Sequence, residues 1–434
     1  MAIRYRQVVM PFHEFRVKKS YITFEMLCCF FLPLLTFIRL PLIGTLLGSD
    51  VLLLMLIPIL IFNPHRFNLQ KQAYLGKILL FVGMWIIAAI VSDVRAHSSF
   101  IDIIRTQAAL WTLAGYFFVF FVLVDGRLDR ATAALVGSSF ALIIKNILNI
   151  DGLGGSFFGI QWKFGTGMSV MILTLIVLKR WLRTRKSQGI FTMLFSLVHL
   201  ALNARSLFLI CFLSGGASVF SFGGLGRYAR IGIACLIVIM SILIYPIAEK
   251  VYGSAVISGM FGQETKDKYI MQTQGDLGVL LGGRSEMLIS LKAIAEKPLL
   301  GFGSYAKDMD LRMQYFQLRE LEGENIRWNA NFVNRSELIP THSFLFGAWV
   351  NNGILGAWFW IYIFFVVFQG IMAGAFGYKT VSPIFLVPMI AILWNILFSP
   401  FGLTQRIFVP IYVVIACTII AQNIRSPSRF RENL

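Results

Sequence analysis

Residues 108–124 read AALWTLAGYFFVFFVLV, a run of 17 residues without a charged side chain. A helix needs about 17–25 apolar residues to cross the hydrocarbon core of a bilayer, so this run is long enough to span one. Eleven further apolar blocks occur along the chain, three before this run and eight after it. The sequence therefore predicts an all-α polytopic membrane protein with about 12 transmembrane helices. Their approximate limits are 22–38, 44–62, 77–93, 108–125, 131–149, 166–180, 188–203, 205–221, 230–247, 342–369, 381–399 and 405–423.

The composition of the whole chain agrees with this prediction. Of the 434 residues, 57% are hydrophobic and 14% are charged, against roughly a quarter charged in an ordinary soluble domain. These proportions exclude a soluble enzyme and a disordered chain. The net charge of +18 does not indicate nucleic-acid binding, because cytosolic loops of membrane proteins carry an excess of lysine and arginine.

The cysteines and acidic residues form no metal or redox pattern. All five cysteines lie within apolar blocks, and the sequence contains no Cys-x-x-Cys motif and no His/Cys cluster. Asp308 and Asp310 form an Asp-x-Asp pair, but residues two apart on a helix point to different faces. We therefore expect no metal site and no cofactor.

Lysine and arginine residues are distributed unevenly between alternate loops. With the N-terminus in the cytosol, the cytosolic segments carry 21 of these residues and the short outside loops carry seven. Because cytosolic loops are enriched in Lys and Arg, this bias predicts that both termini are cytosolic. The basic first twenty residues show no small-x-small cleavage site after a short apolar run, so no removable signal peptide is expected.

One segment is much longer than a connecting loop. Residues 248–340 form a 93-residue stretch between the ninth and tenth apolar blocks, and the predicted topology places it outside. Loops of this length in compact proteins are usually functional. Residues 284–297 and 307–322 have helical character. The chain thus divides into residues 1–247 with nine helices, the partly helical loop, and residues 341–434 with three helices and a cytosolic tail.

Three ionisable residues lie on the predicted outer side. Arg205 occupies a tight turn between two apolar blocks, Arg284 begins the first loop helix, and His342 stands at the entry to the tenth block. Taken alone, each is also compatible with an ordinary interfacial or surface side chain. Together they suit a reaction with a diphosphate leaving group and a hydroxyl acceptor. Guanidinium groups would stabilise the growing negative charge, and the imidazole would receive the acceptor proton.

Other charged residues could assist at the same side. Glu286, two residues after Arg284, is a secondary acid/base candidate. Additional basic residues could create a positive potential that attracts a phosphate. Of these, Lys145 and Arg105 join Arg205 and Arg284 as candidate diphosphate-binding residues. The complete basic set is Lys145, Arg105, Lys163 and Arg406.

Three segments around these residues resemble the O-antigen ligase/polymerase family of bacterial envelope glycosyltransferases. Residues 203–206, NARS, look like the Ser-Arg-type turn of that family, with Ala204 where serine is frequent. GGRSEMLISLKAIAEKPLLGFG (282–303) is similar to its loop segment, an Arg-headed helix followed by Pro-Leu-Leu-Gly-x-Gly. THSFLFGAWVNNGILG (341–356) is similar to the segment that opens its next span.

The resemblance implies a metal-independent glycosyltransferase with GT-C-type architecture in a bacterial inner membrane. Such an enzyme takes a glycan from undecaprenyl diphosphate and joins it to a hydroxyl acceptor in the periplasm, with inversion. Carried onto this chain, the resemblance implies that Arg205 and Arg284 hold the diphosphate and that His342 serves the acceptor.

Members of this family differ in the acceptor to which they transfer the glycan. A polymerase extends another lipid-linked repeat unit of O-antigen or exopolysaccharide, whereas a ligase transfers the glycan to the lipid A core. The loop motifs favour the polymerase, and the ligase remains the alternative. The expected partners are the lipid-linked oligosaccharide, the glycan or lipid A core acceptor, membrane lipids and other envelope polysaccharide assembly proteins. Two alternative functions belong to other classes of protein. One is a flippase or transporter that catalyses no reaction, and the other is a non-catalytic assembly partner.

Overall fold

The computed structural model is built mainly of helices, which confirms the predicted all-α class. It describes residues 22–42, 44–62, 73–150, 152, 158–220, 229, 232, 250, 253–259, 263, 266, 269–270, 285–321, 338–377 and 380–424. The elements up to α8 are α1 (Phe24–Leu34), η1 (Leu35–Phe37), β1 (Arg39–Leu42), β2 (Gly44–Leu47), α2 (Gly48–Ile61), α3 (Ala73–Ala96), α4 (Phe100–Val124), α5 (Leu128–Ile147), η4 (Trp162–Thr166), α6 (Gly167–Leu178), α7 (Arg185–Ala201) and α8 (Arg205–Val219). The later elements are α12 (Ser285–Glu296), α13 (Met309–Leu321), α15 (Phe344–Phe376), α16 (Pro383–Phe398) and α17 (Gln405–Ile424).

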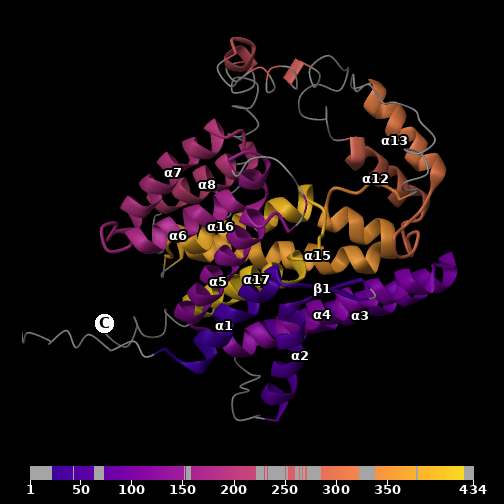
Figure 1. Cartoon of the computed structure of the whole chain (residues 1–434), viewed down its shortest axis with the longest axis horizontal. Coiled ribbons are helices and arrows are strands. Elements are labelled where there is room, and N and C mark those ends of the chain that lie inside the picture. Colours follow the sequence, from indigo (N-terminus) through magenta and orange to yellow (C-terminus); the bar gives the residue numbers. More distant parts are fainter. Residues whose placement is uncertain are drawn as a thin grey trace, which may run out of the picture.

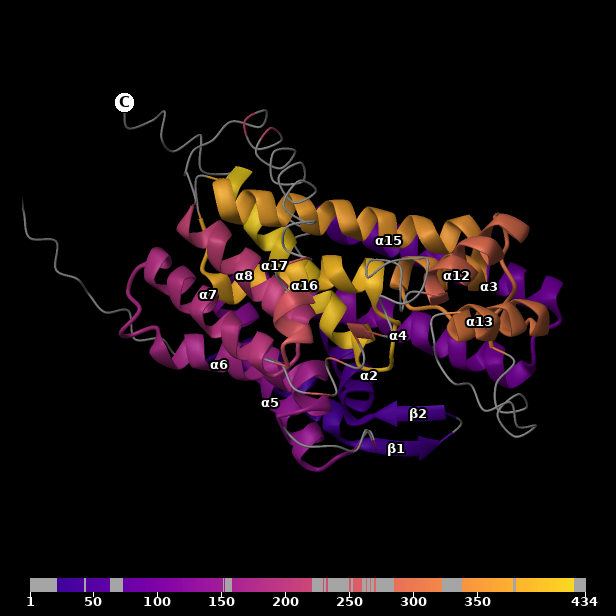
Figure 2. The ribbon, with the colours of Figure 1, turned by 90° about the horizontal axis from the view of Figure 1, so that it is seen from above.

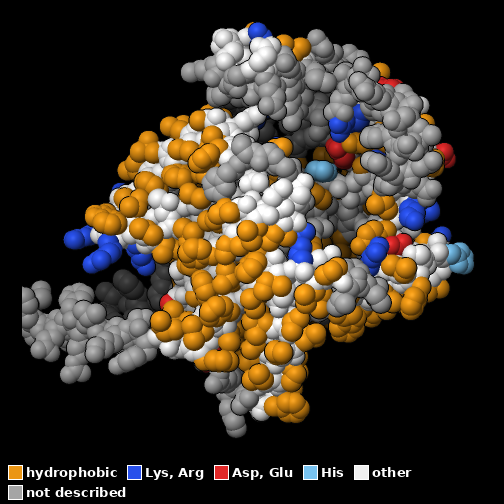
Figure 3. Space-filling model, viewed as in Figure 1, with side chains coloured by type: hydrophobic (Ala, Val, Ile, Leu, Met, Phe, Trp, Pro, Cys, Tyr) orange, Lys and Arg blue, Asp and Glu red, His pale blue; other side chains and the backbone are white. Residues whose placement is uncertain are grey.

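Four of these helices, α3, α4, α15 and α17, are long and apolar enough to cross a membrane. The shorter apolar helices include α1, α2, α6, α8 and α16. Hydrophobic side chains cover much of the bundle in the space-filling view (Figure 3), as expected for helices that face lipid. The predicted block 230–247 lies almost entirely outside the described residues, so the number of twelve spans stays a prediction.

The structure differs from the prediction in the first two apolar blocks, 22–38 and 44–62. Helix α1 ends at Leu34, and the chain then forms the antiparallel hairpin β1–β2 before α2 begins at Gly48. Pro41 lies within β1, and because proline lacks a backbone N–H it could not continue a helix without losing a hydrogen bond. The hairpin therefore shortens both predicted helices.

Helices α15 and α17 pack closely in the middle of the bundle. Gly370 of α15 faces Ala416 of α17, and a Cβ added to Gly370 would lie 2.6 Å from the Cβ of Ala416. Small residues of this kind let two helix backbones approach, which strengthens their van der Waals packing. Helix α15 also packs along α3 and α16 (Figures 1 and 2). Nearly all of α17 is buried as a result.

Hydrogen bonds connect several helix ends to neighbouring turns. Gln422 of α17 donates to the Gly126 carbonyl at the α4–α5 turn, at 3.1 Å. Arg185, the first residue of α7, donates to the carbonyls of Ala217 in α8 and Ala375 in α15. Lys and Arg side chains gather at the α6–α7 turn (Figure 3). These contacts hold the α4–α5 turn, the start of α7 and the ends of α15 and α17 in place, and the cytosolic position of these helix ends stays a prediction.

The loop helices α12 and α13 stand at the opposite end, where α15 begins (Figures 1 and 2). Their bounds match the two helical segments predicted at 284–297 and 307–322. The flanking residues 271–284 and 322–337 lie outside the described part of the chain.

Candidate functional site

A kink in α15 creates the docking site for the loop that follows α12. Gly353 has φ +69°, a left-handed value that interrupts the helix. The carbonyls of Val350 and Asn351, which would accept from the next turn of a regular helix, instead accept from the N–H groups of Phe302 (2.8 Å) and Gly303 (2.9 Å). A side chain on Gly353 would overlap the Leu299 backbone. Glycine is therefore required at the kink, because it alone has no Cβ.

The end of α3 anchors the same loop from the other side. Asp93, 1% exposed, accepts hydrogen bonds from the Ser304 N–H (2.5 Å) and hydroxyl (2.8 Å). The Ser92 hydroxyl contacts the Leu300 carbonyl and the Asn351 carbonyl, at 2.5 and 2.9 Å, and shares its single proton between them. The loop thus bridges α3 and α15, and it fixes the position of α12, which precedes it. The sequence analysis did not single out Ser92 or Asp93.

The docked loop brings α12 beside the start of α15. Ile289 and Ala293 of α12 share a buried apolar cluster with Phe302 and with residues of α13 and α15. The Ser290 hydroxyl contacts the Glu286 carbonyl at 2.6 Å and the Pro340 carbonyl at 3.3 Å. The first turn of α12 is thereby connected to the segment that leads into His342.

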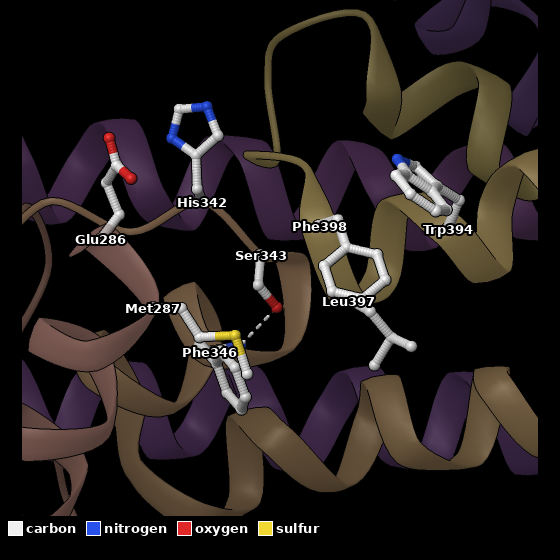
Figure 4. Close-up of a pocket in the computed structure, with 8 residues that line it drawn as sticks. All are labelled: Glu286, Met287, His342, Ser343, Phe346, Trp394, Leu397 and Phe398. Carbon is white, nitrogen blue, oxygen red and sulfur yellow. Dashed lines mark hydrogen bonds between the residues drawn. The ribbon is translucent and has the colours of Figure 1, made fainter. Parts of the chain in front are cut away.

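A cavity of about 150 Å³ opens at this junction. Figure 4 shows that the Glu286 carboxylate and the His342 imidazole both belong to its lining, although they come from α12 and from the segment before α15. His342 is exposed and Glu286 is half-buried. In the space-filling view, Lys or Arg, Asp or Glu, and His side chains lie together in a hollow near the loop helices (Figure 3). The complete lining is Glu286, Met287, His342, Ser343, Phe346, Trp394, Leu397 and Phe398.

The other walls of the cavity are largely apolar and are held by Ser343. The Ser343 hydroxyl accepts from the Phe346 N–H at 3.1 Å and so caps α15. It donates to the Ile396 carbonyl at 2.7 Å, which fixes the end of α16 and its side chains Trp394 and Leu397 against the cavity. A polar pair and an apolar wall therefore share one small hollow, an arrangement suited to a ligand with a polar head and a hydrocarbon part.

Helix α13 supplies the hydrogen-bond partners of Glu286. The Glu286 carboxylate accepts hydrogen bonds from the Tyr315 hydroxyl at 2.8 Å and from Arg319 Nη1 at 3.3 Å. Arg319 Nη1 also donates to the Tyr315 oxygen at 2.8 Å. Burial, with a smaller contribution from the negative charge of Glu286, raises the pKa of Tyr315 to about 12. The phenol is therefore protonated at neutral pH and acts as a donor to the carboxylate. Sequence analysis identified Glu286 but missed its two partners, although their i, i+4 spacing places them on one face of α13.

Arg205 is the first residue of α8 and is half-buried. Its turn is fixed by His199, whose carbonyl accepts from the Ala204 N–H at 2.8 Å. The His199 ring accepts from the Trp162 indole at 3.1 Å. Among the described residues, those that line the cavity do not include Arg205. Arg284 lies outside the described residues.

The other predicted basic residues occupy different surroundings. Lys145 is 8% exposed, in the last turn of α5. Arg105 is exposed on α4 and forms an ion pair of 3.8 Å with Asp102. Arg406 is buried and pairs with Asp50, which also accepts from the Tyr116 hydroxyl at 2.7 Å. The charge of Arg406 is thus engaged within the bundle. The structure therefore brings together Glu286 and His342 of the predicted residues, and it does not place Lys145 or Arg105 at their cavity.

One residue of the Asp-x-Asp pair, Asp308, has a structural role. Asp308 accepts from the Leu311 N–H at 2.9 Å and caps the start of α13. Within the described residues, no group of three or more His, Cys, Asp and Glu side chains is placed to hold a metal ion.

Comparison of the chain with protein-family models, with curated proteins and with solved structures finds no match. The function is therefore inferred from the geometry of the site and from the sequence motifs that surround it.

Proposed function

We propose that this protein is a glycosyltransferase of the bacterial inner membrane, with twelve transmembrane helices, GT-C-type architecture and cytosolic termini. It transfers a glycan from undecaprenyl diphosphate to a hydroxyl acceptor at the periplasmic side. The observation that carries the proposal is the carboxylate–imidazole pair, Glu286 and His342, at the mouth of one cavity with an apolar wall. This pair stands at the end of a bundle whose helices are apolar enough for a membrane.

The proposed reaction is a single displacement. The acceptor hydroxyl gives its proton to the His342 imidazole as its oxygen attacks the anomeric carbon of the donor glycan. The bond from that carbon to the diphosphate breaks, and its electron pair leaves with the diphosphate. Glu286 stabilises the imidazolium that forms beside it, since an opposite charge nearby favours the charged state. Arg205 and Arg284 neutralise the departing diphosphate, because guanidinium groups match phosphate oxygens.

The polymerase is the favoured form of this activity because of the loop motifs in the sequence. Its acceptor is a second lipid-linked repeat unit, and the acceptor of either form carries hydrocarbon chains. The apolar lining of the cavity, which includes Phe346, Trp394 and Leu397, supports a site open to such lipids. Lipid A core in place of the second repeat unit is the acceptor that would identify a ligase instead.

The test uses the purified full-length chain in lipid nanodiscs with a lipid-diphosphate oligosaccharide and EDTA. We expect release of undecaprenyl diphosphate and a lengthened glycan. Replacing a general acid or base typically costs about 10²–10⁴-fold in rate, and Glu286→Gln and His342→Asn should each fall in this range. Intact lipid-linked substrate after incubation with repeat units and with lipid A core would contradict the proposal.

Two matched controls separate chemistry from stability. Glu296→Gln changes an exposed carboxylate on the same helix, and His97→Asn changes an exposed histidine at the α3–α4 turn. Asparagine suits His97, whose φ is +52°. Both variants should keep the wild-type rate.

A further inference from the structure

Helix α13 makes a second polar layer behind the cavity. Tyr315 and Arg319 lie one turn apart on this helix, and each donates to the same oxygen of Glu286, at 2.8 and 3.3 Å. They also contact each other at 2.8 Å. Three side chains therefore form a closed triangle of hydrogen bonds. Neither Tyr315 nor Arg319 lines the cavity.

The triangle is sheltered from solvent. Tyr315 is buried, and the side chains of Glu286 and Arg319 are 14% and 26% exposed. Arg312 stacks over the rings of Phe316 and Tyr315, at 4.6 and 5.2 Å from their centroids. A neighbouring cation over the ring restrains the phenol in its place. The hydroxyl of Tyr315 is thus held at a fixed position toward the carboxylate.

These contacts determine where the carboxylate lies. A glutamate side chain has several rotatable bonds, and fixing it costs conformational entropy that the hydrogen bonds must overcome. Hydrogen bonds to a charged group are about twice as strong as neutral ones. Both donors bind Oε1 of Glu286. Its second oxygen receives no hydrogen bond from any described residue and is available to a group in the cavity.

We infer that Tyr315 and Arg319 are positioning residues, which hold the Glu286 carboxylate in the cavity that it shares with His342, so that it stabilises the imidazolium formed when the acceptor hydroxyl is deprotonated. The inference rests on the proposed function and extends it to residues that do not touch substrate. Without the two donors, Glu286 would still be present but would sample other rotamers. Misplacing a catalytic group by about 1 Å can cost up to 10²-fold in rate.

A double-mutant cycle in the glycan-transfer assay tests the inference. Tyr315→Phe and Arg319→Gln should each lower kcat by about 10–100-fold with KM changed less than about twofold. Arg319→Lys, which keeps the charge, should recover part of the loss. In the Glu286→Gln background, Tyr315→Phe should change the rate by less than about twofold, because there is no carboxylate left to position. The control is Tyr305→Phe, which changes an exposed tyrosine between α12 and α13. This variant should keep the wild-type rate.

The outcomes separate failure of the inference from failure of the proposed function. A wild-type protein that transfers no glycan overturns the proposed function. A wild-type protein that is active and sensitive to Glu286→Gln, yet keeps its kcat in Tyr315→Phe and Arg319→Gln, overturns the inference alone. Equal losses from Tyr315→Phe in both backgrounds would also overturn it, since they indicate a general structural role.

Infrared difference spectra give a readout that needs no activity. The wild type minus Glu286→Gln spectrum isolates the stretching band of this carboxylate, and Tyr315→Phe should shift that band because one hydrogen bond to it is lost. An unchanged band would contradict the positioning role. Melting temperatures within a few degrees of the wild type would confirm that the variants remain folded.

Discussion

The Asp93 anchor supports a quantitative prediction about the loop that positions α12. Asp93→Ala removes two hydrogen bonds to Ser304, one to its N–H and one to its hydroxyl, at 2.5 and 2.8 Å. Ser304 is 5% exposed, so water does not readily replace them. A hydrogen bond to a charged group contributes about 1.5–3 kcal/mol, which gives about 3–6 kcal/mol for the pair. The loop should therefore open far more often, while the bundle stays intact.

Hydrogen–deuterium exchange of the loop measures this opening directly. The amides of Phe302, Gly303 and Ser304 should exchange about 10²–10⁴-fold faster in Asp93→Ala, since each 1.4 kcal/mol corresponds to tenfold. Amides within α17, far from the loop, should keep their protection. The matched control is Asp102→Ala, because the contacts of Asp102, a long ion pair with Arg105 and a hydrogen bond of 2.7 Å from the Ser99 hydroxyl, lie at the start of α4 and do not involve the loop. Unchanged exchange at Ser304 in Asp93→Ala would refute the anchoring role.

Three further predictions concern the kink, the α13 triangle and the buried ion pair. Gly353→Ala should push the Leu299 backbone, and the loop that contains it, away from α15. Proteolytic cleavage between α12 and α13 should then increase, whereas wild-type resistance to the protease would show that the kink tolerates a side chain. Tyr315 has a pKa raised from 10.0 to about 12, so the stability from its neutral phenol is complete below pH 10 and is lost as the pH rises through 12. The 295 nm absorbance difference between wild type and Tyr315→Phe should stay flat up to about pH 10, and an earlier rise would contradict this. Arg406→Met should destabilise the protein by about 3–5 kcal/mol by leaving Asp50 buried and uncompensated; the double variant with Asp50→Asn should recover much of the melting temperature.

The helical class and the loop helices were predictable because they depend on local patterns. Apolar blocks and their charged flanks give the limits of α3, α4, α15 and α17 within several residues. Apolar spacing and a terminating proline give α12. The hairpin β1–β2 was missed, because the apolar residues around Pro41 look the same in a short helix and in a hairpin.

The site was predictable only in part. The sequence identified Glu286 within the long loop 248–340 and His342 just after it, but their place in one cavity depends on contacts between residues far apart in the chain. Asp93 and Ser304 are separated by 211 positions, and no local sequence pattern predicts that such distant residues will form a hydrogen bond. Arg406 was expected to add positive potential, but its partner Asp50 lies 356 positions away. Tertiary pairing of this kind decides which charges are free for a ligand.

The most direct test of the central proposal follows both halves of the lipid-linked donor in one reaction. Proteoliposomes that contain the full chain and a doubly labelled lipid-diphosphate oligosaccharide are incubated with EDTA, and the lipid and the glycan are quantified separately. We predict that undecaprenyl diphosphate and transferred glycan appear in equal amounts, and that His342→Asn and Glu286→Gln reduce both together by about 10²-fold or more. Movement of the glycan across the bilayer with its bond to the lipid diphosphate intact would contradict the proposal and identify a transporter.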